Sequence, residues 1–181
     1  NRDADLGRAK ELAEQALETL EDSPGPDRFD ALDALAATAK WIGNLTAAER
    51  IHLEQLEIAR ATDRTDLEVR ALHALAFVYF ERLEPDRAMP LLERAGELAE
   101  ETGSILGRAG VMRSVGQGLL MRGDLEGAED AIQRSRALFG EAGWRPVSPK
   151  IAKRFASKYP ARPGLARISD RQFGGWRAAD K

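Results

Sequence analysis

The sequence contains no cysteine among its 181 residues. This absence excludes disulfide bonds, cysteine-ligated metal centres and thiol nucleophiles, and it is typical of proteins in a reducing compartment. Long apolar runs are missing as well, since none approaches the ~20 residues that a membrane-spanning helix needs. The first residues also lack the basic and then apolar pattern of a secretion signal. We therefore expect a soluble, cytoplasmic protein without a membrane span.

Histidine is scarce, with His52 and His73 as the two examples. They fall in different predicted helices and do not form a metal-binding spacing such as His-Glu-x-x-His. Neither Ser104 nor Ser114 lies in the Gly-x-Ser-x-Gly elbow of hydrolases, and Ser114 has no histidine near it in sequence. The sequence therefore predicts no catalytic centre, no cofactor and no metal site, and we expect no enzyme activity.

Charge is divided unevenly along the chain, although the net charge is only −3. Residues 1–143 hold 17 Lys and Arg against 28 Asp and Glu, whereas residues 144–181 hold 10 against 2. This division predicts an acidic body followed by a basic tail.

Three segments share one pattern at a spacing of 40 residues. A fixed period of this length is typical of a solenoid, in which each unit buries its apolar face against its neighbours. The three copies are Gly43-Asn44-Leu45 with Ala48, Leu83-Glu84-Pro85 with Ala88, and Gly123-Asp124-Leu125 with Ala128.

Apolar residues at helical spacing predict about seven helices, arranged as antiparallel pairs. We divide residues 1–143 into a half unit at 1–22 and three full units at 27–63, 66–103 and 104–143. Small residues recur where the two helices of a pair meet, so we expect close helix contacts there. These residues are Ala36, Ala76 and Gly116 on the first helices, and Ala48, Ala88 and Ala128 on the second.

Local signals predict where the helices begin and end. The spacing from Thr46 to Glu49 fits a capping box, as does the spacing from Thr65 to Glu68. Gly103 is the expected C-terminal cap of its helix, because glycine adopts positive φ without steric cost. Pro90 falls one turn inside a predicted helix, which predicts a kink or a late helix start.

These patterns resemble the tetratricopeptide repeat family over about residues 3–143. The resemblance rests on Leu75-Ala76-x-x-Tyr79, Ala88 and Leu92-x-x-Ala95, and on their weaker copy 40 residues later. Each unit is six residues longer than the usual repeat, and Gln55 replaces a small residue. The long form resembles repeat regions of bacterial signal-transducing regulators such as LuxR-type ATPases. The resemblance implies a right-handed superhelical solenoid whose first helices line a concave groove.

By the same resemblance, the groove presents aromatic, cationic and amide side chains, a set suited to holding a peptide. Trp41, Phe77 and Phe80 are the predicted anchors, while burial of Phe77 and Phe80 in the core is the open alternative. The sequence then predicts a non-catalytic module that binds a protein, peptide or small effector within a bacterial transcriptional or signalling regulator. The predicted groove residues are Lys40, Trp41, Arg70, His73, Phe77, Phe80, Arg113 and Gln117.

The tail and the first helix leave two further functions open. A short basic helix is predicted near residues 149–159, and it could cap the solenoid, stay disordered, or contact nucleic acid or a membrane. An apolar stripe containing Leu6 and Leu17 lacks a predicted partner helix, so self-association into a homo-oligomer is the first alternative function, and nucleic-acid contact through the tail is the second. The predicted tail contacts are Lys150, Lys153, Arg154 and Lys158.

Overall fold

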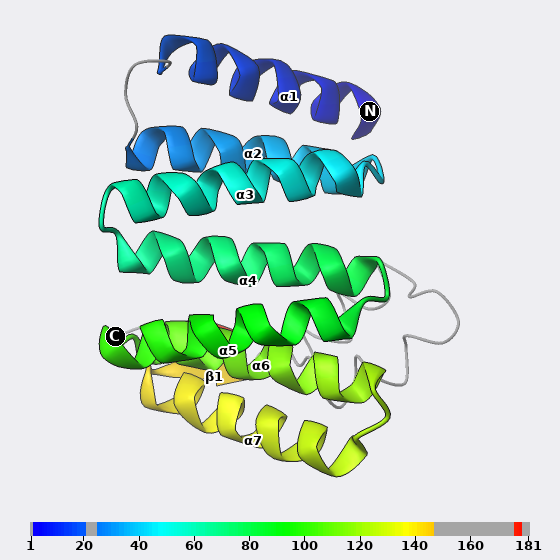
Figure 1. Ribbon diagram of the computed structural model, residues 1–181, viewed down its shortest axis with the longest axis vertical. Helices are drawn as coiled ribbons and strands as arrows, with labels where there is room; N and C mark the ends of the chain where they lie inside the picture. Colours follow the sequence, from blue (N-terminus) through cyan, green and yellow to red (C-terminus); the bar gives the residue numbers. More distant parts are fainter. Residues whose placement is uncertain (1, 21–24, 147–175, 179–181) are drawn as a thin grey trace.

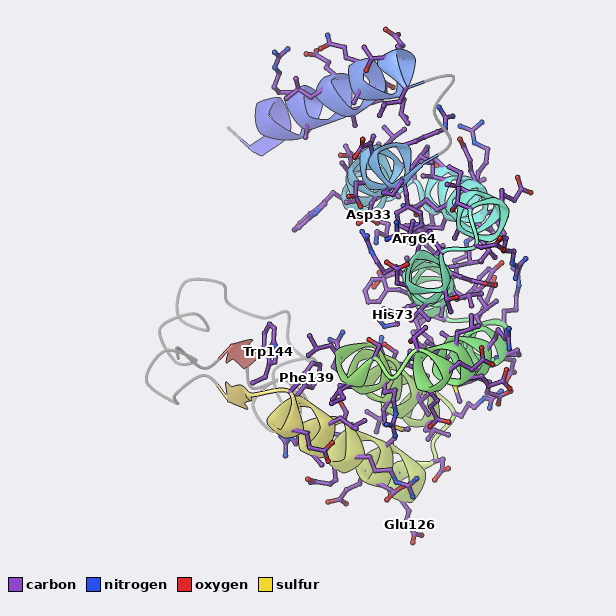
Figure 2. The ribbon with its side chains drawn as sticks, turned by 90° about the vertical axis from the view of Figure 1, so that its left-hand side faces the viewer. Asp33, Arg64, His73, Glu126, Phe139 and Trp144 are labelled. Carbon is purple, nitrogen blue, oxygen red and sulfur yellow. The ribbon has the colours of Figure 1, made fainter. Side chains whose placement is uncertain are left out.

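The computed structural model describes residues 2–20, 25–146 and 176–178. In this part the chain forms helices that run antiparallel to their neighbours and stack into an arc (Figures 1 and 2). The predicted all-α solenoid is therefore confirmed. The helices are α1 (Arg2–Thr19), α2 (Pro26–Trp41), α3 (Leu45–Ala61), α4 (Thr65–Glu81), α5 (Pro85–Glu101), α6 (Ile105–Met121) and α7 (Leu125–Glu141). Two short strands follow, β1 (Trp144–Pro146) and β2 (Trp176–Ala178).

Five consecutive helices, α3 to α7, have the same length of 17 residues. A residue with positive φ follows each of them and also α2, so that such a residue recurs every 20 positions. At the first five of these turns the amide of the following residue donates to the carbonyl five residues back, as Asn44 N does to Ala39 O at 2.8 Å. This closure satisfies the last helical carbonyls and ends the helix. The positive-φ residues are Gly43, Asp63, Leu83, Gly103, Gly123 and Gly143.

The structure corrects the predicted helix starts. The cap of α3 is Asn44, whose side chain accepts a hydrogen bond from Ala47 N at 3.0 Å, so the box at Thr46 is wrong. The box at Thr65 is wrong too, because Arg64 is the cap residue there and its side chain makes no capping bond. The preceding turn fixes where the helix begins, because the cap residue directly follows the positive-φ position and the helix starts one residue later. Pro90 lies inside a helix that already begins at Pro85, so the predicted late start is wrong.

Close contacts between paired helices occur where small residues were predicted. The side chains of Ala36, Ala76, Ala48, Ala88 and Ala128 are all fully buried. A β-carbon at Gly116 would lie 2.8 Å from Ile132 and 3.2 Å from the Ala128 carbonyl oxygen. Larger side chains at these positions would push the paired helices apart.

Ion pairs join α3 to α4 and α5 to α6 at equivalent positions, with the charges reversed. Arg60 Nε lies 2.9 Å from Glu68 of α4. One period later, Glu100 lies 3.8 Å from Arg108 of α6. Glu68 is mostly buried, whereas both members of the second pair are exposed, so the second pair contributes little to stability on its own.

Different side chains pack at the two ends of the array. At α1, Ala13 is buried and Leu17 packs against the cluster of Leu32, Ala36, Ile51 and Ile58. The apolar stripe of α1 therefore does have a partner within the chain, contrary to the prediction. At the other end, the centroids of the Phe139 and Trp144 rings lie 6.2 Å apart. Figure 2 labels both residues beside the end of α7.

Strands β1 and β2 pair antiparallel, with Trp144 opposite Ala178 and Pro146 opposite Trp176. The sequence did not predict this pairing. The predicted helix near 149–159 lies outside the described residues, and so do Lys150, Lys153, Arg154 and Lys158. Within the part of the chain that the structure describes, no helix is both long enough and apolar enough to cross a bilayer.

Leu83 allows a direct test of how the turns contribute to stability. Its φ of 61° is unfavourable for a leucine, and its side chain is largely exposed. We expect Leu83→Gly to raise the free energy of unfolding by about 0.5–1 kcal/mol, because relief of the φ strain exceeds the entropy cost of glycine. Chemical denaturation at 25 °C measures this change.

The control is the reverse substitution one period later, Gly123→Leu. Glycine 123 has a φ of 83°, and a β-carbon there would meet nothing within 4 Å. The backbone strain alone should therefore lower the free energy of unfolding. A shift in the same direction for both variants would contradict this account.

Candidate binding surface on the inner helices

The helices α2, α4 and α6 form the inner side of the arc. Helix α2 contacts α4, and α4 contacts α6, although α3 and α5 separate these helices in the sequence. Figure 2 shows Asp33 of α2 and His73 of α4 on this inner side. We call the exposed side chains of α2, α4 and α6 on this side the inner face.

Two of the three predicted aromatic anchors lie at the surface. The Phe77 side chain is 39% exposed, and the Lys40 ammonium lies 5.5 Å from the centroid of its ring. This arrangement joins α2 to α4 by a cation–π contact. Trp41 is 68% exposed at the end of α2.

The third predicted anchor is wrong. Phe80 is only 3% exposed and belongs to the main apolar core. Its ring fills space that Gly118 of α6 leaves open, since a β-carbon there would lie 3.1 Å from the ring. Phe80 therefore stabilises the packing of α4 on α6 and is not available to a ligand.

Arg70 lies on the inner face, but its charge is already paired. Its guanidinium lies 3.0 Å from Asp30 and 3.6 Å from Asp33, both on α2. The same group stacks over the Phe29 ring at 4.8 Å from the centroid. Arg70 thus ties α4 to α2, which reduces its value as a donor to a ligand.

His73 contacts a serine from the next inner helix. His73 Nε2 lies 2.6 Å from Ser114 Oγ of α6. Burial, with the added charges of Arg113 and Lys40, lowers the pKa of His73 to about 4. The imidazole is therefore neutral at pH 7.

This pair resembles a nucleophile and base by distance alone. A histidine with a pKa of about 4 is a weak base at neutral pH. Among the described residues, no carboxylate bonds to the His73 ring to orient it. The Ser114 backbone lies within α6, so its N–H is used by the helix and offers no oxyanion hole. We interpret the pair as a structural link between α4 and α6.

Lys40 and Arg113 differ from most other cations of the described part. Neither forms an ion pair with a carboxylate that the structure describes. Both are close enough to His73 to lower its pKa, so they lie on either side of it. Gln117, one turn beyond Arg113 on α6, adds a half-buried amide. The inner face thus combines two unpaired positive charges with the exposed part of the Phe77 ring.

A second histidine lies in the interior and was not predicted as part of any site. The Gln55 amide donates to the Phe29 carbonyl at 2.8 Å, and Gln55 Oε1 lies 2.6 Å from His52 Nδ1. Because that oxygen accepts, Nδ1 must carry the hydrogen. His52 Nε2 is then a buried acceptor without a partner among the described residues.

The polar chain of His52 and Gln55 joins α3 to α2. Burial lowers the pKa of His52, and the hydrogen bond to Gln55 offsets only part of this shift. Two periods after Gln55, Ser135 donates to the Ala109 carbonyl at 2.8 Å in the equivalent place. The departure of Gln55 from the repeat pattern therefore reflects a packing bond between paired helices.

The described residues contain no group of three or more potential ligands that could hold a metal ion. Together with the fold, the site defines the described part as a helical repeat protein with a polar and aromatic inner face. No protein-family model matches the chain.

Known proteins that resemble this chain include a solved structure and a protein with a short stretch of similar sequence. BtubC (BKLC) from P. vanneervenii has a TM-score of 0.68 at 19% identity, over 80% of this chain and 61% of that chain. This likeness shows the helical repeat fold alone. A sulfate-binding protein of Synechocystis is 42% identical over 45 residues, which are 25% of this chain and 12% of that protein. The chain thus covers less than two thirds of the length of each of these two proteins.

The neutral state of His73 predicts how stability depends on pH. The unfolded chain takes up a proton near pH 6.5, whereas folded His73 does so only near pH 4. Its contribution to stability is therefore complete above pH 6.5 and falls as the pH drops toward 4. Between pH 7 and pH 5, the wild type should lose about 2 kcal/mol more of its free energy of unfolding than His73→Gln.

Urea denaturation of both proteins at the two pH values measures this difference. His52 is present in both proteins, so its own titration cancels from the comparison. Equal losses in the two proteins would show that His73 titrates normally in the folded state.

Proposed function

We propose that the chain is a non-catalytic binding module whose inner face holds an acidic peptide segment with an apolar anchor. The observation that carries this proposal is the pair of cations Lys40 and Arg113, which lie near His73 and Phe77 and form no ion pair with a described carboxylate. Most arginines of the body are already paired, as Arg70 is with Asp30. Two unpaired cations beside an exposed ring form a surface that a carboxylate-bearing peptide complements.

The aromatic part of the surface supplies the anchor. Phe77 and Trp41 offer exposed ring area at one end of the inner face, and aromatic side chains often dominate the energy of peptide binding. Gln117 adds a half-buried amide that can bond a peptide backbone. A small effector with an acidic group would use the same residues.

The wider context of this function is also a proposal. The long repeat period and the pattern around Leu75 and Ala88 favour the tetratricopeptide class. Within that class, the 40-residue form favours a place in a bacterial transcriptional or signalling regulator. The structural likeness to BtubC supports the repeat fold and leaves this role as our proposal.

A charge reversal on the inner face tests the proposal. Peptides selected on the wild-type chain from a random display library should be enriched in Asp and Glu. Arg113→Glu should weaken their binding by about tenfold or more, because a charge-assisted hydrogen bond is replaced by repulsion. Fluorescence anisotropy of labelled peptides at two salt concentrations measures this loss.

The chain offers a matched control in Arg50. This arginine is exposed on α3, outside the inner face, and forms no ion pair with a described residue. Arg50→Glu makes the same change in net charge and should alter binding by about twofold at most, through long-range electrostatics alone. Equal losses for the two variants would mean that net charge, and not the inner face, determines binding.

A further inference from the structure

The three turns that join α2 to α3, α4 to α5 and α6 to α7 lie side by side along one edge of the array. Arg82 of the second turn reaches Thr46 at 3.4 Å, just after the first turn. Arg122 of the third turn donates through Nε to Asp86 at 2.8 Å, just after the second. These bonds make one continuous surface, which we call the turn edge and define as residues 41–46, 81–86 and 121–126.

The turn edge carries the most exposed large apolar side chains of the described residues. Four such side chains lie on it, and each is between 63% and 79% exposed. Elsewhere in the described part, no large apolar side chain is more than 50% exposed. A cluster of exposed apolar side chains at one edge is typical of an interaction surface. The four residues are Trp41, Ile42, Leu83 and Leu125.

Leu83 adds an independent sign of function. The two equivalent turns place Gly43 and Gly123 at the position with positive φ, with values of 78° and 83°. Leu83 adopts a φ of 61° at this position, although its side chain is 79% exposed. Its backbone strain is thus not offset by burial within the described residues. Strain of this kind is often retained where a residue contacts a partner.

The charge of the turn edge indicates the chemistry of that partner. The three segments hold five carboxylates and two arginines. Both arginines are paired, Arg82 with Glu49 at 2.6 Å and Arg122 with Asp86. Glu81 and Glu126 form no ion pair with a described residue, and Figure 2 shows Glu126 pointing away from the arc. An anionic membrane or nucleic acid would be repelled here.

We propose that the turn edge is a docking surface for a partner protein whose helix presents apolar side chains between Lys and Arg residues. Leu83 is the central contact, with Ile42 and Leu125 on either side. The basic residues of the partner pair with Glu81 and Glu126. This surface shares only Trp41 with the inner face, and it binds a partner of opposite charge to the peptide held there.

The test separates binding from folding. Asparagine tolerates positive φ, so Leu83→Asn removes the apolar contact without adding strain. Its thermal midpoint should be equal to or above that of the wild type. The matched control is Leu106→Asn, which changes an exposed leucine of α6 at the opposite edge of the array.

The probe is a display library of helix-forming peptides with Leu, Lys, Glu and Ala at varied positions. Peptides enriched on the wild-type chain should carry Leu or other apolar residues three or four positions apart, flanked by Lys. Leu83→Asn should weaken their binding by about tenfold or more, as loss of a central contact does. Leu106→Asn and Arg113→Glu should leave it within about twofold, because both lie outside the turn edge.

Several results would overturn the proposal. Enrichment of Glu-rich peptides would exclude a partner helix that carries apolar side chains between Lys and Arg residues. Failure to enrich any peptide would exclude it as well. Equal losses for Leu83→Asn and Leu106→Asn would show that the turn edge has no special role. Sedimentation that reveals dimers in the wild type and monomers in Leu83→Asn would assign the edge to a second copy of the chain. Co-sedimentation with phosphatidylserine vesicles that Leu83→Asn abolishes would assign it to a membrane.

Discussion

A backbone constraint at single residues determines most of this structure. From Gly43 to Gly143 every twentieth residue adopts positive φ, and the bond across the first five of these turns ends the helix at the same place. Helices α3 to α7 therefore have equal lengths whatever their sequences. Equal lengths keep residues one period apart in register, so that Arg70 reaches Asp30. The polar contacts between units follow from the turns.

The inner face is what remains exposed after the inner helices pack against one another. Phe77 and Phe80 illustrate this on α4, since they are one turn apart and have opposite environments. Gly118 leaves room for the Phe80 ring on α6, whereas Phe77 stays partly exposed beside Lys40. A small residue on one helix thus decides which aromatic of its neighbour is buried.

The sequence predicts this fold well where a feature repeats. The spacing of Ala36, Ala76 and Gly116 indicates both the period and the close helix contacts, because a small side chain has the same effect in every unit. Helix starts are predicted less well, since Thr46 fits a capping box by spacing while the turn at Gly43 makes Asn44 the cap. The pairing of β1 with β2 has no period and joins distant residues, so no pattern indicates it.

The inner face could be predicted only in part for a related reason. The sequence predicts Lys40 and Arg113 on one surface, and in the structure both lie close enough to His73 to lower its pKa. Whether a cation forms an ion pair depends on its neighbours in space. The pairing of Arg70 with two carboxylates of α2 is therefore visible only in the folded structure. The contact of His73 with Ser114 spans 41 residues, one more than the period, and a search at that spacing would have found it.

The reversed ion pairs also bear on how such an array survives in evolution. Genes with internal repeats lose or gain whole units when near-identical copies recombine. Removal of one 40-residue unit here would bring Arg60 to the place of Glu100, opposite Arg108. Two like charges would then meet where each intact junction holds an attractive pair, at a cost of a few tenths of a kcal/mol. The alternation of charge therefore makes each junction specific for its own neighbour and disfavours shortened copies of the array.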